Sequence, residues 1–513
     1  MNNNLLLFER SLGNLPHNVF AGLQTEKLLK SFRSTFRVRF DGGERIAQPG
    51  VRGGSTSRTP RTSLAGAEEN ERHSIWAHQA GVTALAVERF DGRRLVSGGA
   101  DGTIKLWDLE QCPNPSSIHT YRPVLSAPRA ETTNSTTGHR FSVTHLSFYP
   151  FDELAFLSSS FDQTLKLWST ATARVSGSFD LGAKVYTHAT SPIAPHLLVA
   201  CGTQHPAVRL VDLRSSAAIQ SLLAPGQPGS STGAVLSVAW SPIHDHVLAS
   251  GSADGAVRIW DIRRSNALIG LLDQEDSLGI HHPGRMPAPD TSTPTPTPQG
   301  IGRGIRASAK AHTGPVNGLT WTDTGTHLIS AGHDRRVRVW DAATGANTLA
   351  NFGPTLRNSQ VGSLTMFVAP EGLAPTRHDL LFYPNETEIL VMDLHEGTIV
   401  TRLRGAGPSV AAVAAQRGER AVRNRVTSVA WRGAGGSGSS TGGVMGGRNT
   451  PGAVYSGHLD GQIRAWMPQL EGLDEEGRPP AGEGEEDGDA RAKKRRALDD
   501  AFRSLMGREP GIG

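Results

Sequence analysis

Cysteine is scarce in this sequence, and long apolar runs are missing. The 513 residues contain two cysteines, Cys112 and Cys201, so no disulfide framework can staple the chain. No group of cysteine and histidine has the spacing of a zinc site. The apolar run 5–8 is too short for a signal peptide, and no stretch approaches the ~18 apolar residues of a membrane helix. We therefore expect a soluble intracellular protein in a reducing compartment.

The sequence also lacks a large net charge of either sign. Lysine and arginine number 52 and the acidic residues 48, which gives a formal charge of +4. This balance does not fit a chain that covers nucleic acid or a membrane with its whole surface. Glycine (59) and proline (31) are abundant instead, which predicts many turns and argues against a mostly helical protein.

One pattern occurs five times: a serine, an aspartate four residues later, and a tryptophan six residues after that. Small residues precede a polar turn, and alternating apolar and polar residues follow it, as in a β-hairpin. The copies are Ser97-Asp101-Trp107, Ser158-Asp162-Trp168, Ser250-Asp254-Trp260, Ser330-Asp334-Trp340 and Ser456-Asp460-Trp466. Two weaker copies carry Cys201-His205-Val211 and Phe382-Glu386-Met392 at these positions. The sequence therefore predicts seven repeats with core tryptophans.

The repeat resembles the WD-repeat family, whose units are four-stranded blades that close into a ring without open edges. The resemblance covers residues 75–469 and implies an all-β, seven-bladed WD-repeat β-propeller. It also implies a hydrogen-bonded network in each blade, which runs from the aspartate through an upstream histidine and the serine to the tryptophan indole. His78, His139 and His312 have the spacing for that histidine. The fourth unit has Ser231 there, so we expect an incomplete network in that blade.

Histidine, serine and aspartate in one unit would also suit a hydrolase triad. The set recurs in repeat after repeat, whereas catalysis needs it once, and no nucleophile elbow, phosphate loop or zinc-protease helix occurs. We therefore predict a protein that is not an enzyme and has no cofactor. His244 with His246, and His281 with His282, could ligate a metal, but we interpret both pairs as turn residues without carboxylate or cysteine partners. No metal site is predicted.

Residues 1–34 have the pattern of a helix, a break and a second helix. Their apolar residues are Leu5, Leu6, Phe8, Leu12, Leu28, Leu29 and Phe32. Residues 36–40 alternate strictly between apolar and basic, so we assign 35–40 as the strand that closes the last blade. The two helices have no place in a ring, and their apolar face implies a groove on a partner.

Polar segments rich in glycine and proline separate the blades, and we predict that they are disordered loops. They cover 111–136, 221–232, 273–309 and 433–452, with a similar linker at 41–74. The tail 470–513 is acidic and then basic, and we predict that it too is disordered. Its basic run Lys493, Lys494, Arg495 and Arg496 is either a nuclear-import signal or a solvated charge run.

Several segments outside the repeat consensus are similar to the Cockayne syndrome group A family. They include H-R-F-S-V-T-H-L-S-F-Y-P-F-D at 139–152, V-Y-T-H-A-T-S-P at 185–192 and T-G-A-N-T-L-A-N-F-G at 344–353. The resemblance implies a substrate receptor of a cullin-4 type RING ubiquitin ligase that acts in the nucleus in transcription-coupled nucleotide excision repair. Its client would be a stalled RNA polymerase II complex with its remodelling ATPase.

Receptors of this class carry a W-D-x-R motif, matched by Trp260 to Arg263 and in part by Val211 to Arg214. The resemblance implies that the motif and the helices bind the adaptor, a damaged-DNA-binding protein 1 subunit. The residues that we assign to this contact are Leu5, Leu6, Phe8, Arg10, Leu12, Leu28, Leu29, Asp261 and Arg263. Two alternatives stay open. One is a general WD-repeat scaffold of a nuclear complex, and the other is a direct reader of damaged DNA through Arg335, Arg336 and Arg338, although the charge balance does not favour nucleic-acid binding.

Overall fold

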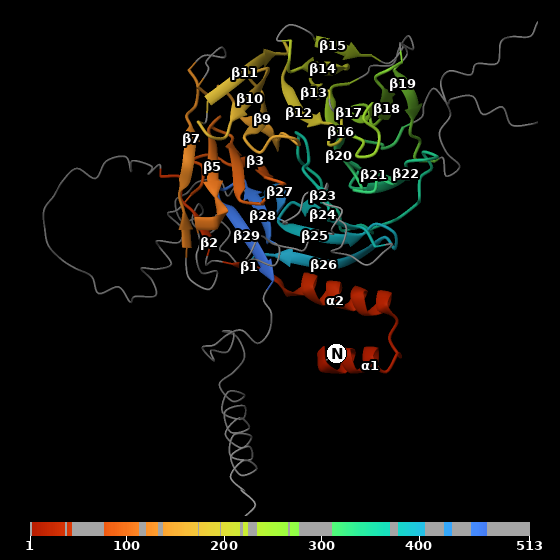
Figure 1. Ribbon diagram of the computed structural model, residues 1–513. Coiled ribbons are helices and arrows are strands. Elements are labelled where there is room, and N and C mark those ends of the chain that lie inside the picture. The colour runs from red at the N-terminus through yellow and green to blue at the C-terminus, as the bar shows by residue number, and fades with distance from the viewer. Residues whose placement is uncertain are drawn as a thin grey trace, which may run out of the picture. The chain divides into compact units, whose positions relative to one another are not determined.

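The chain forms seven small sheets arranged in a ring, a seven-bladed β-propeller (Figure 1). This computed structural model describes residues 3–35, 38–43, 76–111, 119–131, 137–172, 174–194, 196–215, 219–223, 233–264, 267–275, 310–369, 378–405, 425–432 and 453–468. The described residues belong to one compact unit, 1–468, and the tail from 469 onward lies outside them. The predicted fold class is confirmed.

Each blade is an antiparallel sheet whose strands are consecutive along the chain, except in blade 1, which skips β6, and in blade 7. Blade 1 holds β3 (Val82–Val87), β4 (Arg94–Gly99), β5 (Ile104–Asp108) and β7 (Pro123–Ala127); blade 2 holds β8 (Val143–Phe148), β9 (Ala155–Ser160), β10 (Thr164–Ser169) and β11 (Arg174–Asp180). Blade 3 holds β12 (Val185–Thr190), β13 (Leu198–Thr203), β14 (Val208–Asp212) and β15 (Ile219–Leu222); blade 4 holds β16 (Val235–Trp240), β17 (Val247–Ser252), β18 (Val257–Asp261) and β19 (Leu268–Leu271).

Blades 5 to 7 complete the circle. Blade 5 holds β20 (Val316–Trp321), β21 (His327–Gly332) and β22 (Val337–Asp341); blade 6 holds β23 (Phe367–Val368), β24 (Leu380–Asn385), β25 (Glu388–Asp393) and β26 (Thr398–Arg404). Blade 7 holds β27 (Val426–Arg432), β28 (Ala453–His458), β29 (Ile463–Pro468) and, from the N-terminus, β1 (Phe32–Thr35). The innermost strands of successive blades contact one another all the way round, and β27 against β3 closes the ring.

The repeat pattern places its tryptophan on the third strand of the blade, where the side chain is buried between neighbouring sheets. All five of these tryptophans are at most 1% exposed. In the two weak repeats, Val211 and Met392 occupy the same strand position and are also fully buried. An apolar residue at this position is therefore enough to form a blade.

Hydroxyl groups tie the inner strand of one blade to the next. Thr83 donates to the carbonyl of Val143 at 2.6 Å, and Thr144 donates to the carbonyl of Val185 at 2.9 Å. Thr427 donates in the same way to the carbonyl of Val82 and so joins blade 7 to blade 1. These contacts between repeats were not among the sequence predictions.

The ring is closed by residues earlier in the chain than the sequence predicted. Strand β1 pairs antiparallel with β29, with Phe32 opposite Pro468 and Ser34 opposite Trp466. Helix α2 (His17–Ser31) leads directly into β1 without a loop. The assignment of 35–40 as the closing strand is therefore wrong except at Thr35, where β1 ends. Phe32, which we assigned to a helix face, is instead buried against blade 7 at 1% exposure.

Part of the predicted closing strand has a different partner. Strand β2 (Val38–Phe40) pairs in parallel with β6 (His119–Tyr121), outside the seven blades. Phe40 packs edge-on against Trp107 at 5.2 Å and stacks on Tyr121 at 5.1 Å, and it also touches Tyr455 of blade 7. The segment therefore packs across the junction between blades 7 and 1.

The segment 111–136 is also not wholly the disordered insert that we predicted. It contains β6 and β7, and β7 is the outer strand of blade 1, paired with β5. The prolines of this segment led us to predict a loop. Pro123 is the first residue of the strand, and because β7 is an edge strand the missing N–H costs little there. The other predicted inserts, the linker and the tail fall almost wholly outside the described residues.

Two helices precede the ring, as predicted. Helix α1 (Asn3–Ser11) contacts α2, which in turn contacts the outer parts of blades 6 and 7 at β26 and β29 (Figure 1). The guanidinium of Arg10 lies 4.5 Å from the ring centre of Phe20 and links the two helices. No helix among the described residues is long and apolar enough to cross a membrane.

Candidate functional site

The predicted repeat network can be followed atom by atom in blade 2. The indole N–H of Trp168 donates to Ser158 Oγ at 2.7 Å, and Ser158 Oγ lies 2.6 Å from His139 Nε2. His139 Nδ1 lies 2.8 Å from Asp162 Oδ2. Burial lowers the pKa of His139, so the neutral ring accepts from Ser158 and donates to Asp162. Each polar group in this buried chain therefore has a partner.

Blade 5 repeats this geometry, and blade 1 modifies it. His312 lies 2.7 Å from Ser330 Oγ and 2.9 Å from Asp334 Oδ1. In blade 1, His78 Nδ1 lies 3.9 Å from the carboxylate of Asp101, and the hydroxyl of Thr103 bridges the two groups. The aspartate therefore reaches the histidine either directly or through one hydroxyl.

Blades 4 and 7 complete their networks with other residues. In blade 4, Arg258 donates to Asp254 Oδ2 at 2.7 Å and to Ser252 Oγ at 2.8 Å, and Ser231 lies outside the described residues. In blade 7 the histidine comes from the strand itself, because His458 Nε2 lies 2.8 Å from Ser456 Oγ. In both blades the tryptophan indole still donates to the serine, at 2.8 Å.

The serines of these networks have no access to a substrate. Ser97, Ser158 and Ser330 are completely buried, and each accepts a hydrogen bond from a tryptophan. A hydrolytic nucleophile must reach the scissile group, which these hydroxyls cannot do. The sets are structural, as expected for a WD-repeat propeller.

The W-D-x-R motif lies at the end of β18, where the chain turns toward β19. Asp261 is buried, and its carboxylate accepts the Arg263 backbone N–H at 3.1 Å and the Arg263 Nε at 3.2 Å. Burial alone would raise the pKa of Asp261, but the hydrogen bonds from Arg263 outweigh it and keep the pKa below its usual value. Arg263 itself is 65% exposed, so this turn holds an oriented cation at the surface.

The same turn recurs after the third strand of other blades. An aspartate ends the strand and accepts the backbone N–H two residues later, at Glu110, Arg214, Arg263, Ala343 and His395. We call the propeller face that carries these turns the third-strand rim. Asp261 is therefore a structural residue of a common turn, and the residue two positions later is what differs between blades.

The exposed apolar side chains of the helix pair lie mainly on α1 and in the turn that follows it. Leu7 is 54% exposed, Phe8 57% and Leu12 56%, and Val19 on α2 is 49% exposed. Leu5 and Leu6 belong to α1, but their side chains lie outside the described residues. Apolar side chains this exposed and this close in sequence are typical of a surface that a partner covers.

Two predicted adaptor contacts belong to the ring instead. Leu29 is 1% exposed and is buried with Phe32 and Trp466 in the core shared by blades 6 and 7, and Leu28 packs against the same core. Leu29 was wrongly assigned to a partner contact, because the C-terminal half of α2 docks on the propeller. The predicted docking element therefore reduces to α1 and the start of α2.

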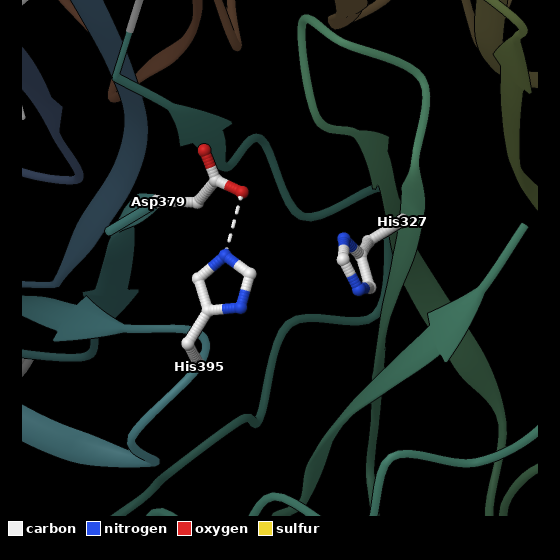
Figure 2. Close-up of side chains that lie close together, drawn as sticks. All are labelled: His327, Asp379 and His395. Carbon is white, nitrogen blue, oxygen red and sulfur yellow. Dashed lines mark hydrogen bonds and ion pairs between the residues drawn. The ribbon is translucent and has the colours of Figure 1, made fainter. Parts of the chain in front are cut away.

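The third-strand rim also carries a cluster that the sequence did not predict. His395, from the turn after β25, lies with its Nε2 3.1 Å from Asp379 Oδ2, just before β24. Figure 2 shows this pair facing the ring of His327, the first residue of β21, and the two imidazole centres are 5.3 Å apart at right angles. Repeat positions alone cannot reveal such a cluster, because its members come from turns of two blades.

The other functional residues predicted from the sequence either have hydrogen-bond partners within the fold or lie outside the described residues. Arg338 donates to Asp334 and to Gln274, which leaves Arg335 and Arg336 as the exposed members of the trio. His246 does have a carboxylate neighbour, since its Nδ1 lies 2.6 Å from Asp245 Oδ1, which corrects our reading of that turn. The pair 281–282 and the basic run 493–496 lie outside the described residues.

The propeller, its tryptophan–serine networks and its third-strand turns define a class of protein, and comparison with known families agrees. The WD domain, G-beta repeat family matches residues 69–108, 130–169, 225–261 and 305–341. These matches end at the third strands of blades 1, 2, 4 and 5, all of which carry the tryptophan.

Three individual proteins are similar to this chain. The chain is 30% identical over 328 residues to WD repeat-containing protein ATCSA-1 of Arabidopsis thaliana, which covers 55% of this chain and 71% of that protein. It is 27% identical over 300 residues to ribosome biogenesis protein YTM1 of Phaeosphaeria nodorum, covering 55% of this chain and 57% of the relative. It is 24% identical over 208 residues to radiation-sensitive protein 28 of Saccharomyces cerevisiae, covering 40% and 39%. This chain belongs to the WD-repeat family and is related to ATCSA-1.

Proposed function

We propose that this protein is the substrate-recognition subunit of a cullin-4 type RING ubiquitin ligase and acts in transcription-coupled nucleotide excision repair in the nucleus. The observation that carries the proposal is that helix α1 stands outside the ring and that Leu7 and Phe8 on it, with Leu12 just after it, are more than half exposed. A seven-bladed ring does not need such a helix for closure, since β1 already completes blade 7. A groove on an adaptor of the damaged-DNA-binding protein 1 type would cover these side chains.

Arg263 gives a second point of attachment. Its guanidinium is exposed and aimed by Asp261, so it loses little freedom when it meets an acceptor on a partner. The equivalent turn of blade 3 presents Arg214. A rim contact of this kind orients the ring on the adaptor, while the apolar side chains of α1 supply most of the binding energy.

The proposed mechanism is positional. The receptor performs no chemistry, and it holds a client protein close to a ubiquitin-loaded conjugating enzyme, which raises the effective concentration of the two reactants. The adaptor takes the helices and the third-strand rim, which leaves the opposite face for the client. We propose as client a stalled RNA polymerase II complex with its remodelling ATPase. The relation to ATCSA-1 supports the resemblance to the Cockayne syndrome group A family on which this proposal rests.

The test is co-purification of the adaptor and the cullin with the full chain. A chain that lacks residues 1–15 removes α1 but keeps the part of α2 that packs on blades 6 and 7. We expect this truncated chain to stay folded and to lose both partners. As a matched control, Val361→Asp changes an apolar residue that is 77% exposed on the ring itself and should keep both partners. Retention of the adaptor by the folded, truncated chain would refute the receptor assignment.

A general scaffold in ribosome assembly is the second candidate. It is favoured by the 27% identity to ribosome biogenesis protein YTM1 over 300 residues. Such a scaffold would co-sediment with pre-ribosomal particles on a sucrose gradient, with or without α1. The ligase receptor would migrate instead with the adaptor and the cullin, and only when α1 is present.

A further inference from the structure

Three side chains of metal-binding type meet on the third-strand rim between blades 5 and 6. His327 comes from the start of β21, Asp379 from the residue before β24, and His395 from the turn after β25. Their ligand atoms all lie within 4.8 Å of one another (Figure 2). We propose that these three residues bind one divalent transition-metal ion of the zinc type, which links blade 5 to blade 6.

The spacing of the facing pair fits a metal. In a tetrahedral site with bonds of about 2.0–2.1 Å, two ligand atoms are roughly 3.3 Å apart. His395 Nε2 and Asp379 Oδ2 are 3.1 Å apart and share a hydrogen bond. The ion would replace the shared proton, so these two ligands need almost no movement to bind it.

The third ligand requires only a side-chain rotation. His327 is half-buried at the start of β21, and its backbone is held in place because its N–H donates to Thr322 Oγ1 at 3.0 Å. The hydroxyl of Thr326 lies 3.0 Å from Nδ1, so we assign Nε2 as the atom that would bind the ion.

The backbone around the other two ligands is fixed by neighbouring contacts. Asp393 Oδ1 accepts the N–H groups of His395 and Glu396 at 2.9 and 3.2 Å, and its Oδ2 lies 2.6 Å from His378 Nδ1. The Leu394 N–H donates to the Asp379 carbonyl at 2.9 Å. The Asp393 carboxylate therefore holds the backbone of His395 in place, the role that outer-shell residues have in metal sites.

The donor set selects the class of metal. Two imidazoles and one carboxylate suit zinc, cobalt, nickel or copper, whereas calcium and magnesium prefer oxygen ligands alone. Because these three residues supply three donors, a water would complete a tetrahedron. The ligands belong to different blades, so the bound ion would link blade 5 to blade 6.

The experiment uses the untagged full chain, freed of metal with a chelator, and titrates it with ZnCl₂ by calorimetry. We expect one ion per chain and a higher melting temperature when zinc is bound. His327→Ala and His395→Ala should each lower the affinity by at least the ~10–100-fold that loss of an outer-shell partner costs. His246→Ala is the matched control, because it removes another rim histidine that has an aspartate neighbour, and it should leave the affinity unchanged.

Two results would overturn the site. The first is that zinc does not bind saturably at one ion per chain. The second is that His327→Ala and His395→Ala both bind zinc as tightly as the natural chain. His395 is exposed in the turn, so His395→Ala should fold even if His327→Ala does not. Titration with CoCl₂ adds a readout that stability cannot mimic, because a tetrahedral cobalt site gains intense visible absorption that the His395→Ala chain should lack.

Discussion

Replacing Phe32 by alanine tests how the ring is closed. Phe32 is the first residue of β1 and is 1% exposed among Leu29, Trp431 and Trp466, with its ring centre 6.4 Å from that of Trp431. Removing a buried phenylalanine side chain costs about 3–5 kcal/mol, because the transfer free energy is lost and a cavity remains. We therefore expect Phe32→Ala to lower the free energy of unfolding by about this amount.

The assay is equilibrium unfolding in urea, followed by tryptophan fluorescence and by circular dichroism. Phe8→Ala is the matched control, because it removes the same side chain from a site that is 57% exposed, and its effect should stay within about 0.5 kcal/mol. A loss below about 1 kcal/mol for Phe32→Ala would mean that β1 does not hold blade 7 closed, and the reasoning would be refuted.

Three further predictions follow from buried polar groups. Asp254→Ala removes the acceptor of the Ala256 backbone N–H and one of the two side-chain acceptors of the Arg258 guanidinium, so unfolding in urea should show a loss of about 1–3 kcal/mol. Burial lowers the pKa of His78 to about 3 and that of His145 to about 4. The folded protein therefore keeps its full stability above pH ~6.5 and loses stability as the pH falls toward the lowered pKa, by about 3 kcal/mol for His145. A urea midpoint that does not fall between pH 7 and pH 4.5 would contradict this prediction. Burial also raises the pKa of the Cys201 thiol, so a thiol reagent should fail to label Cys201 in the folded chain and label it in urea.

The ring could be predicted from the sequence because its signal lies within each repeat. The serine, aspartate and tryptophan sit on one hairpin, so their spacing along the chain fixes their spacing in the blade. Even blade 6, where Met392 replaces the tryptophan, could be found, because its strands keep the apolar pattern.

Features that depend on contacts between repeats could not be predicted in this way. The closing strand was misplaced because Phe32 fits a helix face and a strand equally well, and its packing with Trp466 in the folded ring decides between them. The rim cluster joins His327 of blade 5 to His395 of blade 6, and neither residue stands out in its own repeat.

The measurement that tests the proposed function most directly is a titration of the purified full chain against the purified damaged-DNA-binding protein 1 adaptor. The natural chain should bind, the Phe8→Asp/Leu12→Asp chain should not, because charges would enter an apolar groove, and Arg263→Ala should bind more weakly than the natural chain. All three chains should melt alike, since none of these side chains packs in the ring. Unchanged binding by the folded Phe8→Asp/Leu12→Asp chain would contradict the receptor function and favour the general scaffold.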